Sequence, residues 1–217
     1  MKPNNLLQHL LVVAALSLGL AGPARADDIL PGEKPAPITG NLSLLGQSFA
    51  TLDYTRINLD DTSVNADSYS LEVNQPLSFG FDGIVGYDYT RSGTFAGSRV
   101  TQHTVWGALR AFSSSYNWGK PYVEAGIGHV WSRFAGARDN SLLWEVGAGA
   151  EFQVSQRGTV TPYVQYLDTP DLAGTEGTWN FGVKGSYWID SHWAVTAGIE
   201  RDDEQNTAFT VGTNFRY

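Results

Sequence analysis

Apolar and polar residues alternate with a period of two over most of the chain after residue 48. The pattern is clearest over residues 144–154, where every second position is apolar and the positions between are glutamate, glycine or glutamine. A period of two is that of a β-strand with one apolar and one polar face. The same alternation places Trp193 and Val195 on one face of a later strand and Thr196 on the other.

Alternating segments recur ten times, separated by stretches rich in glycine, asparagine, aspartate and serine. A series of segments about ten residues long is typical of transmembrane β-barrels. Bacterial single-chain barrels have an even number of strands, so we expect ten, with eight as the alternative if two weak segments are not strands. The expected strands cover residues 48–57, 67–74, 83–92, 100–112, 120–131, 141–154, 159–167, 178–189, 192–201 and 207–217.

The connections between these segments indicate how the barrel lies in a membrane. Tight turns such as 155–158 are expected on the periplasmic side, and polar connections such as 134–140 and 169–177 on the outside. The connections 75–82 and 113–119 are long for periplasmic turns.

The polar face of the expected strands is rich in glycine, which favours a narrow barrel because small side chains let the wall close around its contents. We therefore predict an all-β fold, a closed antiparallel up-and-down transmembrane β-barrel with its apolar face outward. A periplasmic or secreted β-sandwich also alternates and is the competing interpretation. The inward glycines are expected to be Gly126, Gly128, Gly147, Gly149, Gly182, Gly198 and Gly212.

The N-terminal residues have the pattern of a secretory signal peptide. Lys2 precedes an apolar run over 10–20, and Ala24-Arg25-Ala26 forms a small-x-small cleavage site. The run is too short for a spanning helix, although an uncleaved anchor is the alternative. The expected organisation is a signal peptide at 1–26, a periplasmic tether rich in proline at 27–47, and the barrel at 48–217.

Charge and cysteine content exclude several classes of function. Removing residues 1–26 removes Lys2 and Arg25 and no acid, so 12 basic and 22 acidic residues remain, a net charge of −10. Such a surface disfavours nucleic acid, whose binding depends on Lys and Arg. Without cysteine there is no disulfide, no thiolate metal site and no lipid anchor on an N-terminal cysteine.

The C-terminus resembles the closing strand of bacterial outer-membrane barrels. Its apolar residues alternate up to a final aromatic, which is Tyr217 where such barrels usually have Phe. Together with the signal peptide and the strands, residues 48–217 resemble the small barrel family of OmpA-like and opacity-type surface proteins. This resemblance implies the outer membrane of a Gram-negative bacterium, with its lipid, lipopolysaccharide and the barrel-assembly machinery as partners. The residues expected to form the assembly signal are Phe209, Val211, Phe215 and Tyr217.

Seven tryptophans suggest two aromatic girdles, because indole prefers the membrane–water interface. In a soluble protein the same residues would form a core. Trp106 fits neither girdle and is expected to point inward. The girdles are expected to contain Trp131, Trp144 and Trp179 near the loops and Trp118, Trp188 and Trp193 near the turns.

Charged residues on the inward face decide between a plugged barrel and a channel. Opposite charges would pair and fill the interior, which we favour, whereas unpaired charges would line an aqueous path with an excess of carboxylates. The expected interior charges are Glu72, Glu124, Glu145, Glu151, Glu200, Arg110, Lys184 and Arg216.

No motif for catalysis, a cofactor or a metal stands out in the sequence. His103, His129 and His192 are isolated, and we interpret them as structural. The acidic runs 60–61 and 202–204 could bind divalent ions but are more often solvated loop tips. We therefore expect a structural or surface-interaction role with a plugged interior. A narrow, porin-like channel with a weak cation preference is the alternative, and a barrel enzyme comes third.

Overall fold

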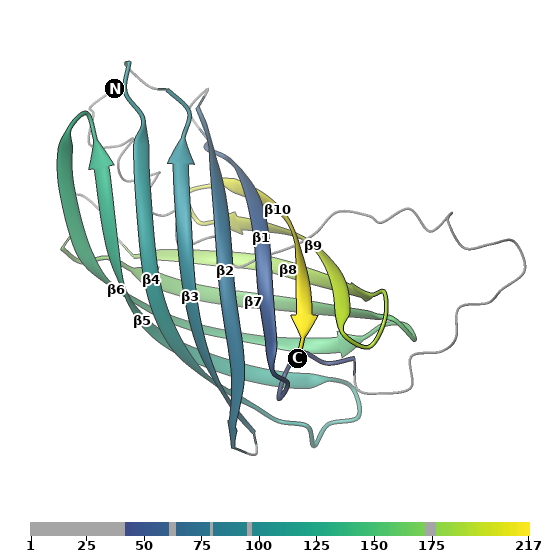
Figure 1. Ribbon diagram of the computed structural model, residues 1–217. Coiled ribbons are helices and arrows are strands. Elements are labelled where there is room, and N and C mark those ends of the chain that lie inside the picture. The colour runs from purple at the N-terminus through teal and green to yellow at the C-terminus, as the bar shows by residue number, and fades with distance from the viewer. Residues whose placement is uncertain (1–41, 61–63, 79, 95–96, 172–176) are drawn as a thin grey trace, which may run out of the picture.

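The computed structural model describes residues 42–60, 64–78, 80–94, 97–171 and 177–217, which form ten β-strands (Figure 1). The sequence alternates apolar and polar residues over most of their length, which suits a strand with different environments on its two faces. The strands are β1 (Phe49–Asn58), β2 (Asn65–Ser78), β3 (Phe81–Ser92), β4 (Val100–Phe112), β5 (Lys120–Phe134), β6 (Ala137–Gln153), β7 (Gly158–Asp168), β8 (Thr178–Trp188), β9 (Trp193–Asp202) and β10 (Thr207–Arg216).

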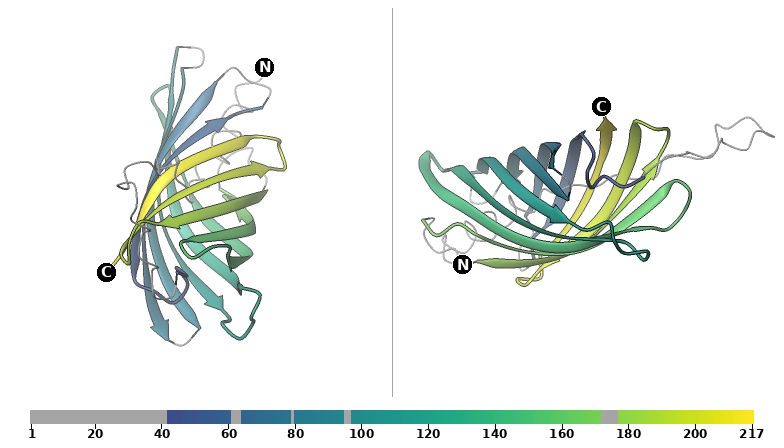
Figure 2. Two further views of the ribbon diagram at one scale, coloured as in Figure 1. Left: turned by 90° about the vertical axis from the view of Figure 1, so that its right-hand side faces the viewer. Right: turned by 90° about the horizontal axis from the view of Figure 1, so that it is seen from below.

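Each strand pairs antiparallel with its neighbours in the chain, and β10 pairs with β1, so the sheet closes into an up-and-down barrel. The predicted ten strands and their closed antiparallel order are confirmed. The strands are strongly tilted, so that those at the front of Figure 1 cross those behind, and the two views of Figure 2 show the closed wall from other sides.

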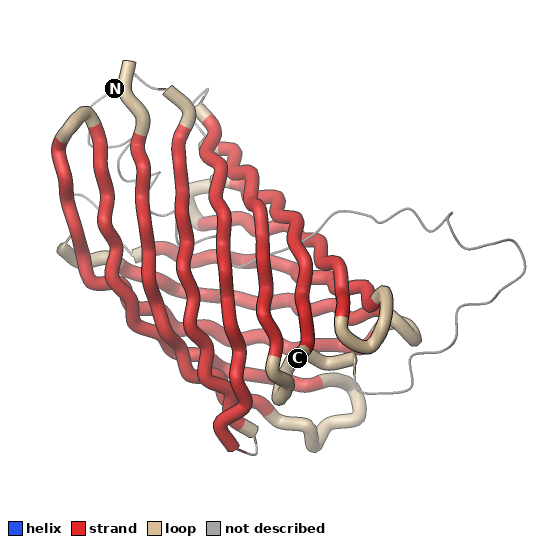
Figure 3. The backbone as a smooth tube through the Cα atoms, in the orientation of Figure 1, coloured by secondary structure: helices blue, strands red, loops and turns tan. Residues whose placement is uncertain are grey.

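All described secondary structure is strand, as the tube in Figure 3 shows. No helix of the described residues is long and apolar enough to cross a membrane.

Two strand pairs are longer than the sequence predicts. β2 and β3 extend toward each other, which leaves a connection of two residues, 79–80, in place of the expected turn at 75–82. The expected loop at 134–140 is wrong, because β5 and β6 meet at Ala135 and Gly136, which both have positive φ. A tight hairpin of this kind needs such conformations, and residues 137–140 are exposed at its tip, where no buried face imposes an apolar pattern.

The two ends of the barrel are named by what they carry. The terminus end holds the start of β1, the end of β10 and the connections 79–80, 113–119, 154–157 and 189–192. The loop end holds the opposite ends of the strands, where β1 leads to β2, β3 to β4, β5 to β6, β7 to β8 and β9 to β10. The lengths overlap, so connection length alone does not distinguish the two ends.

The faces of the wall are opposite in character to those of a soluble protein. Large apolar side chains point outward, and Val85 and Ile127 are 61% and 60% exposed. Polar side chains point inward, and Asn74 and Asn214 are fully buried. A β-sandwich would bury its apolar faces instead, so this arrangement contradicts the sandwich interpretation.

Inward glycines make room for large side chains on neighbouring strands. A Cβ atom on Gly86 would lie 2.3 Å from the ring of Trp106, and one on Gly182 would lie 2.4 Å from the ring of Tyr163. Both distances are far below van der Waals contact, so any larger residue would displace the ring. Glycines in the wall therefore let aromatic side chains lie across the interior and fill it.

Candidate functional site

Chain that precedes the first strand lies in the terminus end of the barrel. We call residues 42–47 the N-terminal plug. Leu42, Leu44 and Leu45 of this segment are buried, and Leu42 packs with Phe49 and Trp188. The plug lies within the stretch expected to form a tether, whose other residues, together with the expected signal peptide, lie outside the described part of the chain.

Inward carboxylates bind backbone amides of the plug. Leu44 N–H donates to Glu151 Oε2 at 3.1 Å, and Gly46 N–H donates to Asp82 Oδ2 at 2.9 Å. Backbone without strand partners needs such acceptors when it leaves water. These two carboxylates thus have a structural use at the mouth of the barrel.

Inward donors bind carbonyl oxygens of the plug. Trp188 Nε1–H donates to Leu42 O at 2.8 Å, and the Arg216 guanidinium donates to Ser43 O at 3.0 Å. The same guanidinium lies 4.0 Å from the centre of the Trp188 ring, in a cation–π contact. Carboxylates, a guanidinium and an indole therefore hold the plug from several strands.

Trp188 does not belong to an aromatic girdle, and that prediction is wrong. Its side chain is fully buried. Trp179 and Trp188 lie nine residues apart in the unbroken strand β8, so their side chains point to opposite faces. Strand parity alone identifies Trp188 as an inward residue.

The centre of the barrel holds a buried ion pair. Arg110 Nη2 and Glu124 Oε2 lie 2.6 Å apart, and Arg110 Nε–H donates to the same oxygen at 2.6 Å. Their side chains are 14% and 7% exposed, and the Tyr122 ring lies 5.1 Å from the guanidinium. Two of the eight expected interior charges thus neutralise each other across β4 and β5.

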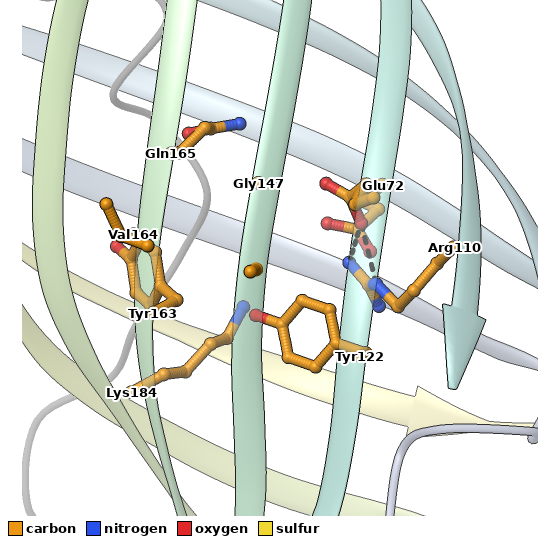
Figure 4. A pocket seen from close by; sticks show the side chains of 10 residues that line it. Glu72, Arg110, Tyr122, Gly147, Tyr163, Val164, Gln165 and Lys184 are labelled. Carbon is orange, nitrogen blue, oxygen red and sulfur yellow. Dashed lines mark hydrogen bonds and ion pairs between the residues drawn. The ribbon is translucent and has the colours of Figure 1, made fainter. Parts of the chain in front are cut away.

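A central cavity of about 60 Å³ lies beside this pair. Tyr122, Tyr163 and Lys184 converge on it, as Figure 4 shows, and Glu72 lines it as well. A space of this size holds only a few water molecules.

Other inward carboxylates also have partners within the wall. Glu145 Oε2 accepts a hydrogen bond from Gln165 Nε2 at 2.9 Å, and Glu200 accepts one from the Tyr163 hydroxyl. The structure places all eight expected interior charges on the inward face. They are Glu72, Glu124, Glu145, Glu151, Glu200, Arg110, Lys184 and Arg216.

Sequence analysis missed five further inward charges, although the parity of β1, β3, β5 and β9 would have found them. Asp88, for example, accepts a hydrogen bond from Trp106 Nε1 at 2.9 Å. With them, the described strands carry nine inward carboxylates against four cations. The additional residues are Asp53, Asp82, Asp88, Lys120 and Asp202.

A cluster of buried apolar side chains lies at the loop end, on the strands and the residues next to them. Ile57 is fully buried there, and Phe134 packs against the group. We call this set the apolar cap, which consists of Ile57, Leu59, Ala66, Val100 and Ala208.

Outward aromatic residues gather near both ends of the barrel. At the loop end, Tyr166 lies between Trp144 and Trp179, with ring centroids 5.3 and 5.1 Å away. At the terminus end, the Trp193 ring lies 4.7 Å from that of Phe215. The structure thus places five of the six expected girdle tryptophans on the outside: Trp118, Trp131, Trp144, Trp179 and Trp193.

The remaining expected residues are placed as follows. Trp106 is buried inside, and Phe209, Val211, Phe215 and Tyr217 alternate outward along β10 and past its end. Of the acidic run 202–204, Asp202 points inward and bonds Asn206, so it is not part of a loop tip. Asp61 lies outside the described residues.

The histidines make separate local contacts. His103 Nδ1 lies 2.7 Å from the Tyr87 hydroxyl, and His192 Nδ1 lies 3.0 Å from that of Ser191. His129 packs on Trp131. Among the residues that the structure describes, no group of three or more His, Asp or Glu side chains could hold a metal ion.

Comparisons with known proteins return barrels. No family model matches the sequence, and no curated protein is found as a relative. Neisserial surface protein A has 9% identity and a TM-score of 0.46, with 78% of this chain and 96% of that one covered. Ail of Yersinia pestis has 13% identity and a TM-score of 0.40, with 79% of this chain and 97% of that one covered. The NanC porin has 8% identity and a TM-score of 0.47, with 77% of this chain and 100% of that one covered. These neighbours are small outer-membrane barrels, and the likeness concerns architecture alone.

Proposed function

We propose that the protein is an outer-membrane β-barrel of a Gram-negative bacterium, with a structural or surface-interaction role and an interior filled by its own residues. The observation that carries this proposal is that the protein's own residues occupy the interior at three levels. These are the N-terminal plug, the Arg110–Glu124 pair and the apolar cap.

The outer surface supports a membrane location. Apolar side chains cover the wall between the outward aromatic residues of the two ends, as lipid requires. The closed ladder leaves no open sheet edge, and an open edge would be costly in hydrocarbon. The outward alternation of β10 also suits recognition by the barrel-assembly machinery. Export by a cleaved signal peptide belongs to the same proposal.

A narrow, weakly cation-preferring channel is the second candidate, and the charge of the interior favours it. Nine inward carboxylates against four cations would attract cations if water passed through. The structural role explains more of the inward carboxylates than the channel does, because several of them bind the N-terminal plug or other residues of the wall. The structural role requires no catalytic group, and we propose none.

Single-channel conductance in a planar bilayer separates the two candidates. We expect the purified, refolded protein to insert, as judged by heat-modifiable gel mobility, and to give no steady current steps. Glu145→Gln removes an inward carboxylate, and Asp203→Asn removes an exposed one at the loop end as the matched control. Steady cation-selective steps that Glu145→Gln reduces and Asp203→Asn does not would establish the channel instead.

A further inference from the structure

A continuous row of mostly cationic residues crosses the outside of the barrel at the loop end. The register aligns Arg56 on β1 with Asp67 on β2, and Asp67 with Arg91 on β3. The row then continues through β4 to β5 and β6. We call it the arginine row, which consists of Arg56, Asp67, Arg91, Thr101, Arg133 and Arg138.

An aromatic row lies directly beneath the arginine row on β1 to β5, two residues nearer the middle of each of these strands, and Asn140 takes this place on β6. The ring centroids of Tyr54 and Tyr69 are 5.4 Å apart, and those of Tyr89 and His103 are 5.0 Å apart. Below it the outer face of β1 to β6 is mostly apolar, with His129 and the Tyr87 hydroxyl as polar groups in the next row. The aromatic row consists of Tyr54, Tyr69, Tyr89, His103 and Trp131. This sequence of layers places the arginines at the level of lipid headgroups.

The cations of the row outnumber its one carboxylate. Arg56 Nη1 lies 2.6 Å from Asp67 Oδ1, so this pair is satisfied. Arg133 and Arg138 face each other across the hairpin, and both are exposed. Like charges directly opposite on neighbouring strands destabilise a sheet, which an anion between them would relieve.

A concave space of about 360 Å³ adjoins the same row. Arg56, Arg91 and Arg99 line it together with the polar residues Asn65 and Ser92. Arginine binds phosphate oxygens in a bidentate manner, and several guanidiniums around one hollow suit a phosphate group.

Basic residues are scarce elsewhere on the outside of the barrel. The structure describes eleven Lys and Arg residues. Four of them point inward, four belong to the arginine row, and Arg99 lies beside that row. Arg201 on β9 and Arg157 at the terminus end are the two that remain. The concentration on β1 to β6 stands out because the protein as a whole is acidic.

We propose that the arginine row and Arg99 bind the phosphate groups of an anionic, phosphorylated lipid in the leaflet that surrounds the loop end. This rests on the proposed membrane location. The aromatic row and the apolar wall beneath it continue toward the bilayer centre, where the acyl chains of such a lipid would run. A lipid therefore fits this surface better than a free phosphate ion.

The test measures binding of bisphosphorylated lipid A to the refolded protein in zwitterionic detergent, by tryptophan fluorescence. The triple variant Arg91→Gln, Arg133→Gln, Arg138→Gln is expected to bind at least tenfold more weakly than the unmodified protein. The double variant Arg157→Gln, Arg201→Gln is the control and should retain full affinity. Added salt should weaken binding by the unmodified protein, because phosphate contacts are screened.

Further measurements distinguish a free phosphate ion from a lipid phosphate, and distinguish failure of this inference from failure of the proposed function. Inorganic phosphate alone should bind far more weakly than lipid A, whereas comparable affinity would make the ligand a free ion and overturn the lipid assignment. Equal affinity of the triple variant and the unmodified protein would overturn the site. Both variants are first inserted into phosphatidylcholine vesicles and checked by heat-modifiable mobility. Failure of the unmodified protein to insert contradicts the proposed function, whereas normal insertion with unchanged lipid affinity contradicts this inference alone.

Discussion

The two ends of the barrel hold different kinds of buried groups. At the loop end, the apolar side chains of the apolar cap pack together and need no polar partners. At the terminus end, main chain of the N-terminal plug enters the mouth, and its amide and carbonyl groups bind Glu151, Asp82, Trp188 and Arg216. Main chain inside a barrel therefore explains a cluster of inward charges that would otherwise indicate an ion path.

Trp188→Ala is expected to have the largest effect, on the terminus end. It removes a fully buried ring, the hydrogen bond to Leu42 and the contact with Arg216. Loss of a buried tryptophan costs about 3–5 kcal/mol, to be measured by urea unfolding of the refolded barrel. The matched control Trp193→Ala, an exposed residue just past the same turn, should cost about 1 kcal/mol or less. Equal costs for the two variants would show that the plug is not held by Trp188.

Ile57→Ala tests the loop end, with an expected cost of about 2–4 kcal/mol because the side chain is fully buried in the apolar cap. The plug lies at the other end, so backbone amide exchange at Leu44 should stay unchanged while exchange near residue 57 speeds up. Faster exchange at Leu44 as well would mean that the two ends are coupled.

Glu151→Gln should have the smallest effect on global stability, about 1–2 kcal/mol, because it weakens a hydrogen bond to Leu44 and keeps the shape of the side chain. Amide hydrogen exchange at Leu44 is expected to accelerate. Glu145→Gln is the matched control, since Glu145 bonds Gln165 in the wall and not the plug. If both variants leave Leu44 exchange unaltered, the carboxylate does not hold the plug.

The alternation of residues was enough to predict the wall, because a period of two defines both the strand and its inward face. Glu145, Glu200 and Lys184 could be placed inside in this way. The same rule places Trp188 inside, although its position next to a turn is also that of a girdle residue.

Two features were beyond the reach of a single sequence. The plug has no alternation, and its partners Glu151 and Arg216 lie 107 and 173 residues further along the chain. The arginine row exists only through the register of six strands, which local pattern does not fix. Arg91 and Arg133 look like isolated loop-end charges until their strands are aligned.

The distance along the chain between the plug and its partners also sets an order of assembly. Leu42 and Ser43 bind residues of β8 and of β10, which are among the last parts of the chain to be made. Contacts this distant in sequence form late, because long loops must close first. We therefore expect the plug to dock after the β1–β10 seam has formed, and its docking to remove water from the mouth at the terminus end.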